Sequence, residues 1–189
     1  MLIRNVALVL ICCVYRLSCA EVAVCNNPAA VVETKKVESM LVDLLHGKKY
    51  ADLNKYFDKL NVQYEQRQID ARQFLAAYLA FSRIDSISDP NEMLLNGENW
   101  QKTAGRYHAT LALAVMHQAL ALKVRGGKFV SETPSGQLDA ATAEFKIEMN
   151  FIKEALKLNP KSMPAKYLEL ELAIRDGNFG NPVKLYQAM

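Results

Sequence analysis

Apolar residues recur at helical spacing along most of this chain, and glycine or proline interrupts the pattern where each segment ends. In residues 37–45, apolar side chains fall at positions i, i+3, i+4, i+7 and i+8, which form one face of an α-helix. No segment of useful length alternates apolar and polar residues as a half-buried strand does. Such segments can bury their apolar faces only against one another, so the sequence predicts an all-α fold of antiparallel helical hairpins.

Turn-forming residues predict where the helices begin and end. Gly47 is placed to cap the end of the first helix, and Gly126-Gly127 to stop a long helix at Arg106–Arg125. Asp70 is a good N-cap, and Asp89-Pro90 opens a short helix because proline is tolerated in a first turn. We expect the helices near residues 37–46, 50–64, 71–81, 90–95, 106–125, 138–158 and 164–175, with a loop at 128–137.

The segment Arg106–Arg125 is apolar on both sides of its helical wheel. A helix of this kind is buried between neighbouring helices. It is too short, and with His117 and Gln118 too polar, to cross a bilayer. We therefore expect it at the centre of the fold, and we expect no stable membrane insertion of the mature chain.

The first twenty residues have the pattern of a signal peptide. Arg4 precedes an apolar run of about ten residues, and the small residues Ser18 and Ala20 suit signal peptidase, with cleavage between Ala20 and Glu21. The run is shorter than the roughly 20 apolar residues that span a bilayer. The sequence predicts an exported protein, periplasmic or secreted. A lipid anchor is disfavoured, since neither Cys19 nor Cys25 follows a lipobox.

Charge and cysteine content limit the classes of partner and of stabilisation. The formal net charge is +3, and removal of the first 20 residues leaves 21 basic against 20 acidic residues. That balance provides no basic stripe for nucleic acid. Of four cysteines only Cys25 lies beyond residue 20, so the mature chain is expected to hold together by packing alone, without an internal disulfide.

These observations divide the chain into four parts. Residues 1–20 are the expected signal peptide, and residues 21–32 an extended lead-in. Residues 33–177 are expected to form one α-helical hairpin domain, and residues 178–189 either a tail or the start of a further helix after Pro182.

One junction resembles the boundary between tetratricopeptide units. In that motif a small residue, a proline, a second small residue and a glycine recur, here as Ala155, Pro160, Ala165 and Gly177. Small residues let helices approach closely, and proline stops a helix. Leu170 and Pro182 depart from the motif, which prefers small residues at both positions. The resemblance implies a tetratricopeptide-like repeat that coils into a right-handed superhelix.

The chain also resembles the bacterial family known as domain of unknown function 4034. The resemblance covers roughly residues 40–177: LLHGKKYADLNKYFDKLNVQYEQ, the helix of Phe74 and Phe81, Trp100, Arg125-Gly126 and ALKLNP. Thr103, Ala104 and Arg106 stand where the family pattern has proline and serine. The resemblance implies a helical, tetratricopeptide-like fold and no activity, since the family has no assigned one.

Few residues point to chemistry. HExxH, GxSxG and GxxxxGK[ST] motifs are absent, and His108 and His117 face opposite sides of one helix, so neither a metal site nor a cofactor site is expected. Glu144 and Glu148 are four residues apart and could share one helix face, but without a histidine or metal partner we expect a solvent-facing pair rather than a catalytic one. The candidate contacts for a ligand or partner are Arg125, Trp100 and His108. For each, a structural role is the competing interpretation: a helix-end cation for Arg125, a plug between helices for Trp100 and a hydrogen-bonded core histidine for His108.

The sequence favours a non-catalytic module that binds a protein or peptide, because stacked hairpins form concave surfaces. No cofactor is expected, and the oligomeric state is left open. Two alternatives remain: an enzyme, such as a hydrolase, with an unrecognised site around His108 and Arg125, and an immunity or effector-associated protein.

Overall fold

The computed structural model describes residues 28–82, 89–127, 130–175 and 180–187. The expected signal peptide, its cleavage site at Ala20–Glu21, and Gly177 lie outside these residues. The chain divides into two units, residues 1–39 and 40–189. Of the first unit, the structure describes only the beginning of one helix.

All regular secondary structure in the described residues is helical, which confirms the all-α prediction. The elements, in chain order, are α2 (Pro28–His46), α3 (Tyr50–Glu65), α4 (Ala71–Leu79), η1 (Ala80–Ser82), α6 (Pro90–Thr103), α7 (Arg106–Arg125), η2 (Val130–Glu132), α8 (Ser135–Leu158), α9 (Met163–Arg175) and α10 (Pro182–Gln187). None of the described helices is long and apolar enough to cross a membrane.

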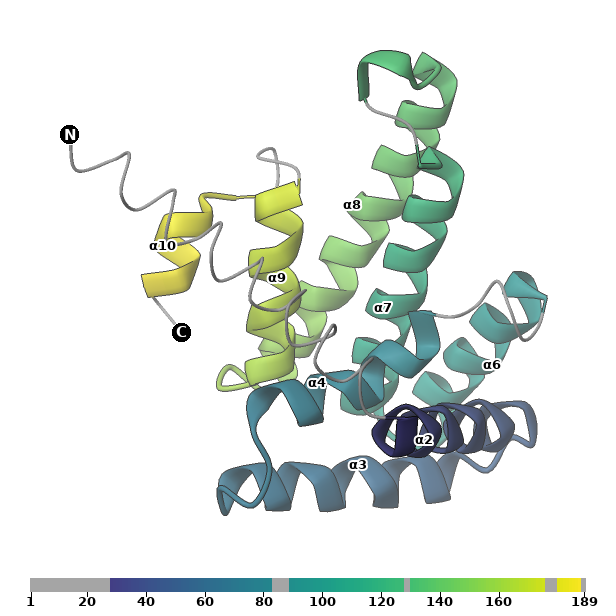
Figure 1. Cartoon of the computed structure of the whole chain (residues 1–189), viewed down its shortest axis with the longest axis vertical. Helices are drawn as coiled ribbons and strands as arrows, with labels where there is room; N and C mark the ends of the chain where they lie inside the picture. The colour runs from purple at the N-terminus through teal and green to yellow at the C-terminus, as the bar shows by residue number, and fades with distance from the viewer. Residues whose placement is uncertain (1–27, 83–88, 128–129, 176–179, 188–189) are drawn as a thin grey trace. The chain divides into compact units, whose positions relative to one another are not determined.

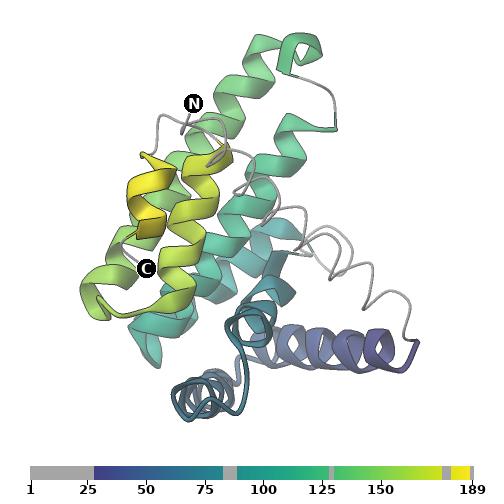
Figure 2. The same ribbon diagram turned by 60° about the vertical axis from the view of Figure 1, so that its left-hand side comes forward.

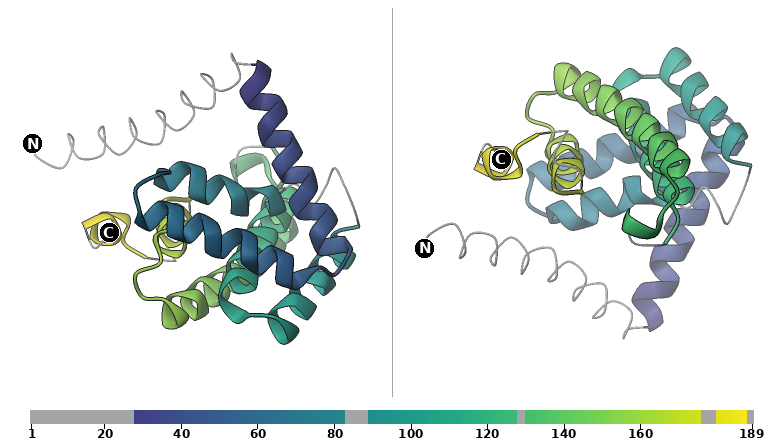
Figure 3. Two further views of the ribbon diagram at one scale, coloured as in Figure 1. Left: turned by 90° about the horizontal axis from the view of Figure 1, so that it is seen from below. Right: turned by 90° about the horizontal axis from the view of Figure 1, so that it is seen from above.

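Helix α7 and helix α8 are the longest pair, and they run side by side in opposite directions (Figure 1). Helix α9 returns along α8, and the short α10 packs on α9 (Figure 2). On the other side of α7 lie α6, α4 and the 3₁₀ turn η1, and α3 lies beside α4 (Figure 3). Helix α7 is therefore covered from several directions, as its apolar sequence predicts.

Two aspartates begin helices as predicted. Asp70 accepts a hydrogen bond from the Gln73 backbone at 2.9 Å, and the Gln73 side chain accepts one from the Asp70 backbone, which completes a capping box before α4. Asp89 accepts from the Asn91 backbone at 3.0 Å, with Pro90 as the first residue of α6. These bonds satisfy amide groups that the first turn of a helix leaves unpaired.

The first helix begins earlier than predicted, and the turn that follows it differs in detail. Residues 28–32, expected to be extended, are helical, because Pro28 occupies a first-turn position and is followed by good helix formers. At the other end, the helix stops at His46 before Gly47 as expected, but the left-handed residue is Lys48, with φ of 54°. Backbone bonds from Lys48 to Leu45 and from Lys49 to Leu44 close this turn.

Helix α6 and helix α8 are both longer than predicted. Helix α6 continues to Thr103 and includes Trp100, although Gly97 lowers its helix propensity. Helix α8 begins at Ser135, inside the loop expected at 128–137. The carbonyl of Pro134, the residue before the helix, accepts the first backbone hydrogen bonds, from the amides of Gln137 and Leu138.

Gly97 lies where α6 packs closely on α7. A Cβ atom at this position would lie 2.9 Å from Cδ2 of Leu113 and 3.3 Å from the sulfur of Met116. The first distance is shorter than real Cβ contacts, so a side chain here would force the buried Leu113 side chain to move. Tertiary packing explains why a poor helix former stands in mid-helix.

Aromatic rings fill the space between α3, α4, α6 and α7. Phe57 stacks on Tyr78 with a centroid distance of 4.4 Å and lies 6.1 Å from Trp100, which in turn lies 6.1 Å from Phe81. All four side chains are fully buried. Arrangements of this kind add about 0.5–1.5 kcal/mol per pair beyond the area that they bury.

We predict that Trp100→Ala lowers the free energy of unfolding by about 3–5 kcal/mol, because it leaves a large cavity and removes the partner of the Asn54 side chain. Urea denaturation followed by circular dichroism at 222 nm measures this without relying on tryptophan fluorescence. Tyr186→Ala, at a ring that is 56% exposed, is the control and should change stability by less than about 0.5 kcal/mol.

Candidate functional site

Trp100 is a structural residue of the core. Its ring has no exposed surface, and its indole Nε1 donates a hydrogen bond to Oδ1 of Asn54 at 2.9 Å. The Asn54 amide nitrogen donates to the carbonyl of Ala104, just after α6. Trp100 therefore joins α3 to the end of α6, and no face of its ring is open to a ligand.

His108 lies in the first turn of α7 and is 7% exposed. Nδ1 lies 2.7 Å from the Tyr78 hydroxyl, and Nε2 lies 2.9 Å from Oδ1 of Asp58. A carboxylate only accepts, so Nε2 carries the ring proton and Nδ1 accepts from Tyr78. Burial lowers the pKa of His108, although Asp58 acts to raise it, so the ring is neutral at pH 7. Burial also holds the pKa of Tyr78 well above its usual value, so the hydroxyl remains a donor.

Arg125 lies far from these two residues. It is the last residue of α7, seventeen positions after His108, which corresponds to about 25 Å along a helix. Its side chain is half-buried, and among the described residues it forms no ion pair with Glu132. A cation at this position complements the negative end of the helix dipole. The structure brings Trp100 and His108 together through Phe57, and it does not bring Arg125 to them.

A polar cluster around the buried Glu148, which we call the Glu148 cluster, joins α7, α8 and α9. It consists of Gln118, Glu148, Glu171 and Arg175. The Gln118 amide donates to Glu148 at 3.2 Å and to Glu171 at 3.5 Å, and Arg175 donates to Glu171 at 2.6 Å. The Arg175 guanidinium also lies over the Phe145 ring, 5.7 Å from its centroid.

The prediction that Glu148 faces solvent is wrong. Its side chain has no exposed surface, and Oε2 has no hydrogen-bond partner. The sequence carried a signal for this: Glu148 stands three residues after Phe145 and four before Ile152, both on the apolar face of α8. Burial raises the pKa of Glu148 to about 8; Arg175 and Gln118 oppose this rise and Glu171 adds to it.

Glu144 has a different role from Glu148. It lies 2.7 Å from Nδ1 of His117, and the His117 ring stacks on Phe151 with a centroid distance of 5.4 Å. This pair joins α7 to α8 one turn from the Glu148 cluster. In the parts of the chain that the structure describes, no group of three or more His, Cys, Asp or Glu residues is placed to hold a metal ion.

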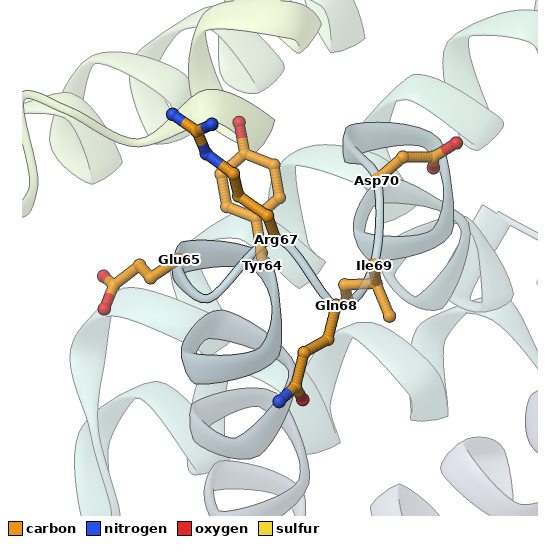
Figure 4. Close-up of a pocket in the computed structure, with 6 residues that line it drawn as sticks. All are labelled: Tyr64, Glu65, Arg67, Gln68, Ile69 and Asp70. Carbon is orange, nitrogen blue, oxygen red and sulfur yellow. The ribbon is translucent and has the colours of Figure 1, made fainter.

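The turn between α3 and α4 forms a shallow, open depression of about 530 Å³, which we call the turn cavity. Its lining residues are Tyr64, Glu65, Arg67, Gln68, Ile69 and Asp70. The side chains of Arg67 and Tyr64 point to the same side of the turn, whereas those of Glu65 and Asp70 point outward on either flank (Figure 4). Nothing in the sequence singled out this turn.

The backbone and the packing of this turn are well defined. Arg67 has a left-handed φ of 58°, and the Gln68 backbone donates to Gln63 at 2.8 Å, which closes the end of α3. The Tyr64 ring packs against Phe74 with a centroid distance of 5.5 Å. The position of the turn is thus fixed from both helices.

A second cavity, of about 270 Å³, lies where the end of α8 meets α9 and α10. Leu156, Pro160 and Leu185 provide its apolar wall, and Lys166 and Glu169 its polar edge. Close to it in sequence, Leu158 is 44% exposed and Val183 38% exposed.

Comparison of the chain with protein-family models, with curated proteins and with solved structures found no match. The resemblance to domain of unknown function 4034 therefore stays a prediction, and the function must be argued from the site.

We predict that His108→Gln lowers stability at pH 8, because a flexible amide loses the ring stacked on Phe57 and does not hold a donor toward Asp58 and an acceptor toward Tyr78 in the directions that the imidazole fixes. The pKa of His108 in the folded chain lies below its ordinary value of 6.5. As the pH falls below 6.5, the unfolded chain therefore takes up a proton at His108 before the folded chain does. This proton uptake favours unfolding, so wild type loses the stability that His108 contributes. The difference in unfolding free energy between wild type and variant should therefore shrink with acidity. Urea titrations at pH 8, 6 and 5 measure it, and a difference that is constant over this range would contradict the assignment.

Proposed function

We propose that the chain is a non-catalytic module that binds a peptide segment of a partner protein, and that an acidic residue of this segment enters the turn cavity. The observation that supports the proposal is that the acidic side chains around this cavity accept hydrogen bonds from neighbouring residues, whereas two of its hydrogen-bond donors have no partner among the described residues.

The acids of the turn cavity already have partners. Glu65 accepts a hydrogen bond from the Asn61 amide at 2.9 Å, and Asp70 accepts one from the Gln73 backbone as the cap of α4. By contrast, two donors of the cavity, the Arg67 guanidinium and the Tyr64 hydroxyl, have no hydrogen-bond or ion-pair partner among the described residues. The cavity therefore offers two unused donors on one side of the turn.

Such a pair of donors suits a carboxylate. An arginine guanidinium binds a carboxylate through two parallel hydrogen bonds, and a tyrosine hydroxyl can donate a third. The charges of Glu65 and Asp70 lie close by, and they disfavour a ligand with many negative charges, such as nucleic acid. The expected partner is thus a peptide with a single acidic side chain.

The arrangement of the C-terminal helices supports the further proposal of a tetratricopeptide-like fold. Ala155 and Ala165 are fully buried where α8 and α9 approach each other, and Pro160 lies in the turn between them. Hairpins that stack in this way commonly present extended surfaces to peptides. This support rests on analogy between folds.

We also propose that the module acts after export, as the pattern of residues 1–20 indicates. Cleavage before Glu21 would give a mature chain that begins at this residue, which intact-mass measurement of the exported protein can test. A hydrolase centred on His108 is less well supported, because both of its ring nitrogens are already engaged, one by the buried Tyr78 hydroxyl and the other by the exposed carboxylate of Asp58.

The peptide-binding proposal is tested with two blocked pentapeptides, Ala-Ala-Glu-Ala-Ala and Ala-Ala-Gln-Ala-Ala, added to the ¹⁵N-labelled full chain. We expect the Glu peptide to shift the backbone signals of residues 64–70 and the Gln peptide to leave them unchanged. Arg67→Met should weaken binding of the Glu peptide by about tenfold or more, as expected for loss of a hydrogen bond to a charged group.

Arg72→Met is the matched control, because Arg72 is also exposed and lies in the first turn of α4, outside the cavity lining. It should bind as wild type does. Equal shifts with both peptides, or equal binding by Arg67→Met and wild type, would contradict the proposal.

A further inference from the structure

Glu148 lies at the centre of a three-helix junction with no access to solvent. Its Oε1 shares the Gln118 amide with Glu171, which brings two carboxyl groups from α8 and α9 to one donor of α7. Its Oε2 is unpartnered, and so is Nη1 of Arg175. This incomplete pairing makes the junction sensitive to the charge of Glu148, because buried polar networks that are not fully satisfied are costly.

The charged groups around Glu148 come from two helices. Helix α9 contributes Glu171 and Arg175, which are paired with each other at 2.6 Å, and α7 contributes only the uncharged Gln118. On α8 itself, Glu144 one turn earlier is engaged with His117. With Glu148 neutral, the one carboxylate and the one guanidinium balance. With Glu148 ionised, Arg175 attracts the new charge and Glu171 repels it, but the largest cost is the loss of water around a buried carboxylate whose Oε2 has no hydrogen-bond partner.

We propose that Glu148 is a proton-operated latch between α8 and α9. While Glu148 carries its proton, α9 stays docked on α8; when the proton is lost, a carboxylate charge that is shut off from water at this junction loosens α9, together with α10, which packs on it. This inference is independent of the proposed peptide binding, since it concerns a different part of the molecule.

The direction of the effect follows from linkage. The docked state holds the proton up to pH about 8, whereas in the undocked state Glu148 ionises near its ordinary value of 4.5. Undocking therefore releases one proton between these two values. The equilibrium for opening of α9 should rise with pH in this window, by at most about tenfold per pH unit, and level off above pH 8.

Hydrogen exchange of the full chain, read by mass spectrometry on peptides from α9, tests this. Rates are measured at pH 5, 6, 7, 8 and 9 and corrected for the intrinsic pH dependence of exchange. In wild type we expect the opening equilibrium of α9 to increase steadily up to pH 8. In Glu148→Gln, which is neutral at every pH, we expect slow exchange with no such increase.

Glu98→Gln is the matched control, because Glu98 lies on the surface of α6 in a pair with Lys102, and it should keep the wild-type profile. An increase of equal slope in Glu148→Gln, or a flat profile in wild type, would overturn the proposal. A slowing of exchange as pH rises would also overturn it, since it would mean that ionised Glu148 captures the free Nη1 of Arg175. Failure of Glu148→Gln to fold would count against it too, because a neutral side chain should suit this junction.

Discussion

The burial of α7 on nearly every side is the constraint on which the rest of the structure depends. Residues 108–116 of this helix are all buried, and so are Gln118, Ala119 and Ala121. A helix that has no polar face for solvent is not stable alone and needs other helices packed on every side of it. Helix α8 covers one side, and α6, α4 and η1 cover others. Each of these helices then has to bury only one stripe of its own, as ordinary amphipathic helices do.

Burial on all sides also forces some polar groups into the interior. At the start of α7, His108 is satisfied through Tyr78 and Asp58, whereas further along, Gln118 meets the partly satisfied Glu148. The two sites respond to pH in opposite directions. Burial lowers the pKa of the imidazole, so the histidine favours the folded state less in acid; burial raises the pKa of Glu148, so the carboxyl favours the folded state more in acid. Below neutrality the two effects partly cancel.

Much of the fold follows from local patterns in the sequence. The limits of α7 were predicted to the residue, because its apolar run ends at a glycine whose φ is 72°. The caps at Asp70 and Asp89 are likewise local chemistry. Helix α6 was predicted too short because Gly97 weakens a helix in isolation, and only the contact with Leu113 shows why it is there. The relative order of hairpins in space depends on long-range packing, and the superhelix stays a prediction.

The site was harder to predict than the fold. Trp100 and His108 are satisfied core residues, which the competing structural interpretations had described, and Arg125 stands apart from both. The turn cavity could not be found from the sequence, because it depends on which polar side chains are already engaged. Tyr64, Glu65, Arg67 and Asp70 are ordinary surface residues in a sequence, and only geometry shows which of them remain free.

The close approach at Gly97 has one further consequence. Because Leu113 packs against a position of α6 that has no side chain, a slide of α6 by a single turn in either direction would set Met93 or Gln101 against it. The glycine thus fixes the register in which α6 and α7 pack. Neither the hydrophobicity nor the length of the two helices specifies that register.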